Sequence, residues 1–100
     1  MLRTDLDKIK KSTYPVLKKA GVKRSSLFGS YARGEQKKNS DIDIIVDFPR
    51  GKGLFEFAEL QMELEKALKR NVDLLTYKSI NHHIKHQVLS EQIVIYEKRQ

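Results

Sequence analysis

The 100-residue chain contains no cysteine, only two prolines and no long uninterrupted apolar run. Without cysteine it can form neither disulfides nor thiolate metal sites, so its stability must come from packing. No apolar segment approaches the roughly 18 residues of a membrane span. The first residues also lack the apolar core of a secretion signal. We therefore expect a soluble, untargeted, cytoplasmic protein.

Size and charge narrow the possibilities further. With 39% hydrophobic residues the chain can fill one two-layer core but not two, so we expect a single domain over residues 1–100. The formal net charge of +7 favours anionic partners, which include nucleotides, nucleic acid and acidic protein surfaces. Lysines on solvated helix faces would produce the same excess. The charge therefore permits direct nucleic-acid binding but does not make it the expected function.

Hydrophobic periodicity divides the chain into alternating helices and strands. We predict strands over Val22–Phe28, Asp41–Phe48, Val72–Thr76 and Ile93–Tyr96. We predict a helix that ends at Gly21, and further helices over Tyr31–Gly34, Leu54–Arg70 and Ser79–Leu89. This alternation is typical of an α/β or α+β fold in which helices pack on one mixed sheet.

Single residues decide two details of these helices. Pro15 interrupts the apolar stripe of the first helix, so we expect a break near Ser12. Leu54 opens a broad apolar face on the third helix, where Glu65 and Lys69 are spaced for an exposed ion pair.

The acids of the second strand form the first half of a candidate site. Side chains alternate along a strand, so Asp41 and Asp43 project from one face with Cα atoms roughly 6.6 Å apart. That separation suits two carboxylates that bind hard cations about 3.5–4 Å from each other. Because the strand is otherwise apolar, a cation is needed to neutralise these charges. Asp47 lies roughly 13 Å beyond Asp43, too far to join the site.

A Gly-Ser turn ten residues before the acids forms the second half. Gly29 and Ser30 precede a short predicted helix, so backbone N–H groups and the helix dipole would point toward a bound anion. Gly29 allows close backbone approach or a positive φ, and Ser30 adds a hydroxyl donor. A Gly-Ser pair alone is usually only a turn. Its fixed distance from the acids favours a phosphate cradle facing a metal site.

Three other sets of polar residues have two interpretations each. Arg33 either clamps phosphate oxygens or pairs with one of the acids. Asp73 either completes a carboxylate triad, if its strand lies beside the second strand, or is a strand-edge acid in water. The histidines His82, His83 and His86 include an i, i+4 pair, which could bind zinc. No carboxylate or cysteine stands nearby in the sequence, so we interpret them as surface or packing residues.

These motifs together resemble the signature of the DNA polymerase beta-like nucleotidyltransferase superfamily. The matching residues are Gly29-Ser30-Tyr31-Ala32-Arg33-Gly34, Ser40-Asp41-Ile42-Asp43, and Asp73 between Val72 and Leu74. In its small size the chain resembles the minimal nucleotidyltransferases, the MntA-type antitoxins encoded beside HEPN-domain toxins. The resemblance covers nearly the whole chain and implies the nucleotidyltransferase fold.

The resemblance also implies roles for individual residues. Asp41 and Asp43 would hold two Mg²⁺ ions, and Asp73 would bind the ion that activates the attacking hydroxyl. Gly29 and Ser30 would hold the triphosphate of ATP. The implied reaction is in-line attack of a hydroxyl on the α-phosphorus, with pyrophosphate leaving. In MntA-like members the acceptor is a tyrosine of the HEPN toxin, whose RNase is silenced by the attached AMP.

Three functions remain open on the sequence. The intact acids and the minimal length favour a Mg²⁺-dependent protein adenylyltransferase that acts as an antitoxin. The positive charge permits nucleotidyl transfer to RNA or to a small hydroxyl compound instead. A non-catalytic antitoxin that neutralises by binding is the third, and the presence of all three acids argues against it. We expect a partner to select the acceptor, with the basic loop Pro49–Gly53 and exposed helix faces as its contacts.

Overall fold

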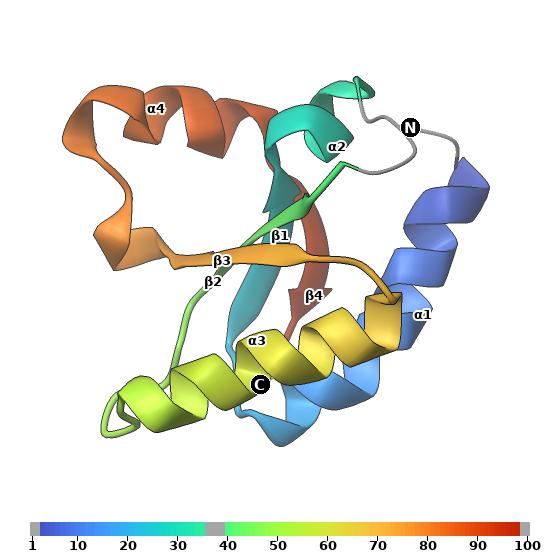
Figure 1. Ribbon diagram of the computed structural model, residues 1–100. Helices are drawn as coiled ribbons and strands as arrows, with labels where there is room; N and C mark the ends of the chain where they lie inside the picture. The colour runs from blue at the N-terminus through green and yellow to red at the C-terminus, as the bar shows by residue number, and fades with distance from the viewer. Residues whose placement is uncertain (1–2, 36–39, 99–100) are drawn as a thin grey trace.

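A computed structural model describes residues 3–35 and 40–98, with side chains from Asp5 onward. Its elements alternate along the chain (Figure 1). They are α1 (Arg3–Lys19), β1 (Arg24–Phe28), α2 (Gly29–Arg33), β2 (Ile42–Val46), α3 (Leu54–Leu68), β3 (Val72–Thr76), the 3₁₀ turn η1 (Tyr77–Ser79), α4 (His82–Glu91) and β4 (Ile93–Glu97). Within the described residues, no helix is both long and apolar enough to span a bilayer.

The four strands form one mixed sheet in the order β3-β2-β1-β4. β1 runs antiparallel to both of its neighbours, whereas β2 and β3 are parallel. Helices α1 and α3 pack against each other, with α1 also contacting β4 and α3 contacting β3. Figure 1 shows α2 and α4 together at the opposite end of the sheet from α3. The prediction of one mixed sheet with helices packed on it is confirmed.

The core lies between the sheet and the α1–α3 layer. Leu17 of α1, Leu27 of β1, Ile44 of β2 and Leu64 of α3 all belong to it and are fully buried. Side chains alternate along β2, so Asp43 projects from the face opposite that of Ile44. The helices therefore cover one face of the sheet, and the candidate acid Asp43 is left on the other.

Helix α1 is continuous, so the predicted break near Ser12 is wrong. Pro15 lies inside the helix and is exposed, whereas Ile9, Thr13 and Leu17 are buried at i, i+4 spacing. Burial of this stripe holds both halves of the helix in line, although proline removes one backbone hydrogen bond. The helix ends before Gly21, which has a φ of +75°, as its sequence predicts.

Helix α3 differs from its prediction at both ends. Leu54 is 82% exposed instead of opening the buried face. The helix stops at Leu68, two residues early, because Lys69 adopts a left-handed conformation with a φ of 55°. The Glu65–Lys69 ion pair is also wrong, since the Glu65 carboxylate accepts a hydrogen bond from the Val72 N–H at 3.0 Å. Glu65 therefore anchors the start of β3.

The cap of α4 is also corrected. Asn81, not Ser79, caps it, and the Asn81 side chain accepts a hydrogen bond from the His83 N–H at 2.8 Å. Ser79 instead closes η1 through reciprocal hydrogen bonds with Thr76, both of 3.2 Å. The helix continues to Glu91 and has no buried residue.

Replacing Pro15 with alanine should stabilise the protein, because the alanine N–H can bond to the Lys11 carbonyl and proline cannot. We expect the free energy of unfolding to rise by about 1–2 kcal/mol, since the freer unfolded chain offsets part of the gain. Guanidinium unfolding followed by circular dichroism measures this change, with the exposed Lys8→Ala of the same helix as control. A loss of stability would show that α1 requires the proline ring.

Candidate active site

The turn between β1 and α2 brings the Gly-Ser pair to the sheet. Gly29 follows directly on β1 with a φ of +66°, a conformation that favours glycine. Helix α2 spans Gly29–Arg33 and so begins two residues earlier than predicted, which places Gly29 and Ser30 in its first turn. Tyr31 is buried in the core and anchors this short helix.

Gly29 lies directly against the second acid. Phe28 pairs with Asp43 across β1 and β2, and Gly29 is the next residue. A Cβ atom at Gly29 would overlap the Asp43 carboxylate oxygen Oδ2 and lie 3.1 Å from its Cγ. Any other residue would displace this carboxylate, so the turn and the acid are packed as one unit.

The third acid is aligned with the second. Asp43 and Asp73 are register partners in the parallel pair β2–β3, whose strands are about 4.8 Å apart. Asp41 immediately precedes β2. The strand that carries Asp73, β3, thus lies beside β2. The sequence predicted that Asp73 could complete a carboxylate triad only with this arrangement. Asp41 and Asp73 are exposed, whereas Asp43 is half-buried.

The surroundings of Asp43 shift the pKa of its carboxyl group. Its pKa is raised from 3.8 to about 6, chiefly by burial and next by the negative charge of Asp73. A hydrogen bond to Asp73 and the charge of Asp41 add to the effect, whereas the positive charge of Arg33 lowers the pKa. Asp43 in its protonated form therefore donates a hydrogen bond to the Asp73 carboxylate.

The chemistry of these acids fits a divalent cation. Carboxylate oxygens are hard ligands of the kind that Mg²⁺ binds, and a cation would relieve the like-charge repulsion that raises the pKa of Asp43. Across residues 5–35 and 40–98, however, no three potential ligand side chains are already gathered around one point.

Arg33 links α2 to α4. Its Nε donates to Glu35 at 2.6 Å, and a second guanidinium nitrogen lies 3.4 Å from Glu91 of α4. The hydrogen bond to Glu35 is the main reason that the pKa of Arg33 is raised. Its charge also reaches Asp43, so it lies within electrostatic range of the acids. The predicted phosphate clamp would require the guanidinium to leave these glutamates.

The remaining candidates lie apart from this cluster. Asp47 is exposed beyond the end of β2, where its backbone forms hydrogen bonds with Lys23 and Arg24. His82, His83 and His86 are exposed on α4, and the rings of His82 and His83 are 6.0 Å apart. In the described part of the chain they join no acid in a set of three potential metal ligands.

A partly buried chain of hydrogen bonds gives no signal in the sequence and was not predicted. The hydroxyl of Ser26, which is fully buried in β1, lies 3.0 Å from the Tyr77 hydroxyl, which donates to the Gln92 side chain at 2.9 Å. Tyr77 directly follows β3, so this chain fastens the exit of the Asp73 strand to β1. The residues are 51 positions apart, and no local spacing signals their contact.

Comparison with known proteins identifies the family. Residues 8–100 match the family model described as "Polymerase beta, Nucleotidyltransferase". The chain belongs to this family. This nucleotidyltransferase is 49% identical over 89 residues to a Methanocaldococcus jannaschii protein named "Putative protein adenylyltransferase", with 89% of this chain and 96% of that protein covered. It is 43% identical over 75 residues to a Thermococcus cleftensis "Protein adenylyltransferase MntA", covering 75% of this chain and 76% of the relative.

A solved structure described as "Crystal structure of the toxin-antitoxin with AMP-PNP" has the same fold. It matches this nucleotidyltransferase with a TM-score of 0.75 and 28% identity, over 90% of this chain and 74% of that chain. The predicted nucleotidyltransferase fold is thereby confirmed, as is the predicted family.

Gly29→Ala should destabilise the nucleotidyltransferase more than Gly51→Ala. Both glycines have a positive φ, but a Cβ at Gly51 would meet no atom within 4 Å. We expect Gly51→Ala to cost about 1–2 kcal/mol of backbone strain, and Gly29→Ala about 1 kcal/mol more from the clash with Asp43. Chemical unfolding measures both. In an Asp43→Ala background the extra cost should vanish, and equal costs in wild type would refute the packing argument.

Asp43→Asn should remove a pH dependence of stability in metal-free buffer. The folded state keeps the Asp43 proton between pH 3.8 and about 6, so wild-type stability falls as pH rises through this window. We expect the loss to be about 1 kcal/mol after allowance for solvent screening. Thermal unfolding in EDTA at pH 4 and pH 7.5 measures it. Asp47→Asn should behave as wild type, and an unchanged pH profile in Asp43→Asn would contradict the assignment.

Proposed function

We propose that this nucleotidyltransferase transfers AMP from ATP to a tyrosine hydroxyl of a HEPN-domain RNase toxin, and so acts as its antitoxin. The observation that carries the proposal is the packing of Gly29 against Asp43, with Asp73 beside it in register. The names of the similar proteins support protein adenylylation, and the toxin–antitoxin complex with AMP-PNP supports ATP and a toxin as partners. Because the target is an RNase, we place the protein in the cytoplasm.

The residues of the chain divide the reaction between them. Gly29 and Ser30, in the first turn of α2, would bind the triphosphate through backbone N–H groups and the serine hydroxyl. Asp41, Asp43 and Asp73 would hold Mg²⁺, which when bound would neutralise charge on the phosphate oxygens and the attacking hydroxyl. Arg33 would exchange its glutamate partners for phosphate oxygens.

The different exposure of Asp43 and Asp73 assigns the two substrates to different sides of the acids. Asp43 is half-buried against Gly29, so the nucleotide phosphates belong on that side, whereas the exposed Asp73 faces the side open to an acceptor. The acceptor oxygen then attacks the α-phosphorus in line. The bond from the α-phosphorus to the oxygen that bridges it to the β-phosphorus breaks, the hydroxyl proton passes to solvent, and pyrophosphate leaves.

Label transfer from α-³²P-ATP with Mg²⁺, in an extract of the source cells treated with RNase, tests the proposal. Wild type and the control Asp47→Asn should label a discrete protein band, and Asp43→Asn should reduce the label at least about 100-fold, because a metal ligand is lost. Label confined to RNA in untreated extract, or to small molecules, would refute the protein acceptor. No label with wild type would favour neutralisation by binding.

A further inference from the structure

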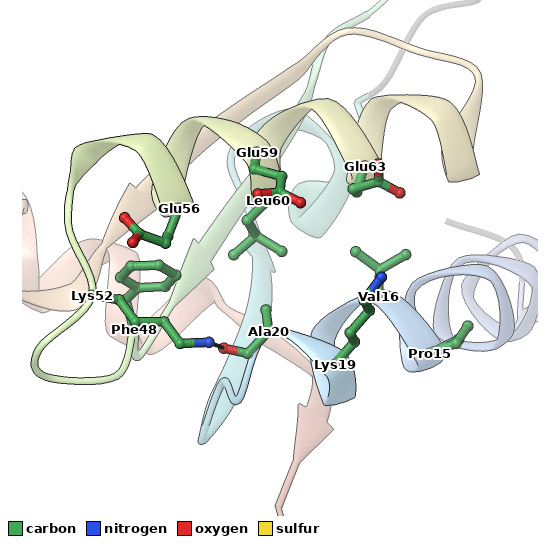
Figure 2. Close-up of a pocket in the computed structure, with 10 residues that line it drawn as sticks. All are labelled: Pro15, Val16, Lys19, Ala20, Phe48, Lys52, Glu56, Glu59, Leu60 and Glu63. Atoms are coloured by element: carbon green, nitrogen blue, oxygen red, sulfur yellow. Dashed lines mark hydrogen bonds between the residues drawn. The ribbon is translucent and has the colours of Figure 1, made fainter.

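A groove lies between α1 and α3, away from the acids (Figure 2). It has a volume of about 370 Å³. Its floor is apolar and consists of Val16 of α1, Ala20 just after α1, Leu60 of α3, and Phe48 from the segment after β2. Phe48 is held in place by an edge-to-face contact with Phe57, whose ring centroid is 5.4 Å away. The groove is therefore lined by side chains that the core already fixes.

The rim along α3 is acidic, although the chain carries a net charge of +7. Glu56, Glu59 and Glu63 follow one another along the same side of α3, as Figure 2 shows. They are spaced at i, i+3 and i+7 and so extend over roughly 10 Å of the helix. All three are exposed. Their charges face the groove and attract cationic side chains into it.

Two hydrogen bonds occupy polar groups at one end of the groove. Lys52, from the basic loop Pro49–Gly53, donates to the Ala20 carbonyl at the end of α1 with a distance of 2.9 Å. Glu56 accepts from the Gly53 N–H at 2.9 Å. These bonds close the end of the groove, whereas Glu59 has no ion pair among the described residues. Glu63 lies 3.7 Å from Lys66 in an exposed ion pair, which contributes little and which a partner's cation can replace. Lys19 of α1 also lines the groove, so the basic side chains of a partner belong along the α3 rim, at Glu59 and Glu63.

The groove is remote from the candidate active site. Asp43 stands at the start of β2 and Phe48 beyond its end, roughly 16 Å apart along the chain. Asp43 also projects from the face of the sheet opposite the α1–α3 layer. A partner bound in the groove would leave the acids and the Gly-Ser turn open.

We propose that this groove docks an amphipathic helix of a partner protein, with apolar side chains on the floor and Lys or Arg side chains along Glu59 and Glu63. A helix meets the groove at matching spacing, because its basic residues at i, i+4 and i+7 repeat over the same roughly 10 Å as the glutamates. The apolar floor supplies the affinity, and the glutamates set the orientation of the helix.

A fluorescein-labelled 15-residue helical peptide tests the proposal, with leucines on one face and lysines at i, i+4 and i+7 beside it. Fluorescence anisotropy should show saturable binding to the full chain and at least tenfold weaker binding of the same peptide with glutamates in place of lysines. Glu59→Lys should weaken binding of the lysine peptide about tenfold. Glu97→Lys, an exposed substitution on β4 with the same change in charge, should leave it within about twofold.

Backbone amide NMR shifts locate the peptide independently of these variants. Binding should shift the amides of Val16, Ala20 and Leu60 and leave those of α2 unchanged. Shifts confined to α2 would place the peptide at the active site and overturn the proposal. Shifts confined to the exposed Leu54 and Phe55 would do the same. Equal affinity for the lysine and glutamate peptides would also overturn the proposal, as would the absence of saturable binding.

Discussion

The candidate site requires Asp43 and Asp73 to stand in register on adjacent parallel strands. Burial and the like charge of Asp73 both raise the pKa of Asp43, because each disfavours the charged form of its carboxyl group. A parallel pair cannot be joined by a tight hairpin, so the chain must cross over the sheet between the two strands. Helix α3 is that crossover, and the burial of Leu60 and Leu64 holds it against the core.

The apolar face of β2 holds the acids in place. Ile42, Ile44 and Val46 are buried in the core, and their alternation with Asp43 fixes the direction in which that carboxylate points. Gly29, which directly follows β1, packs against this carboxylate. Asp43 also has a register partner on each adjacent strand, Phe28 on β1 and Asp73 on β3. Burial that stabilises the strand therefore also raises the free energy of the charged acid. The protein keeps a site that is poorly compensated without a cation and well suited to one.

The sequence predicted those features that depend on local pattern. Alternation placed Asp43 on the face opposite the buried Ile42 and Ile44, and the apolar stretches located every strand within two residues of its ends. The prediction failed where tertiary contacts outweigh local preference. Pro15 does not break α1, because the buried stripe around Thr13 holds the helix together. Glu65 has the spacing of an ion pair, but its carboxylate instead accepts the Val72 N–H.

Long-range packing accounts for the remaining features that the sequence could not predict. The spacing suggested that Gly29 and the acids cooperate, but only the β1–β2 register shows that the glycine lies against Asp43. The chain from Ser26 through Tyr77 to Gln92 has no signature at all, since it joins three separate elements. Both contacts form on the face of the sheet that the α1–α3 layer leaves free. One face of the sheet thus carries the candidate site, while the helices on the other fix the strand register on which the geometry of that site depends.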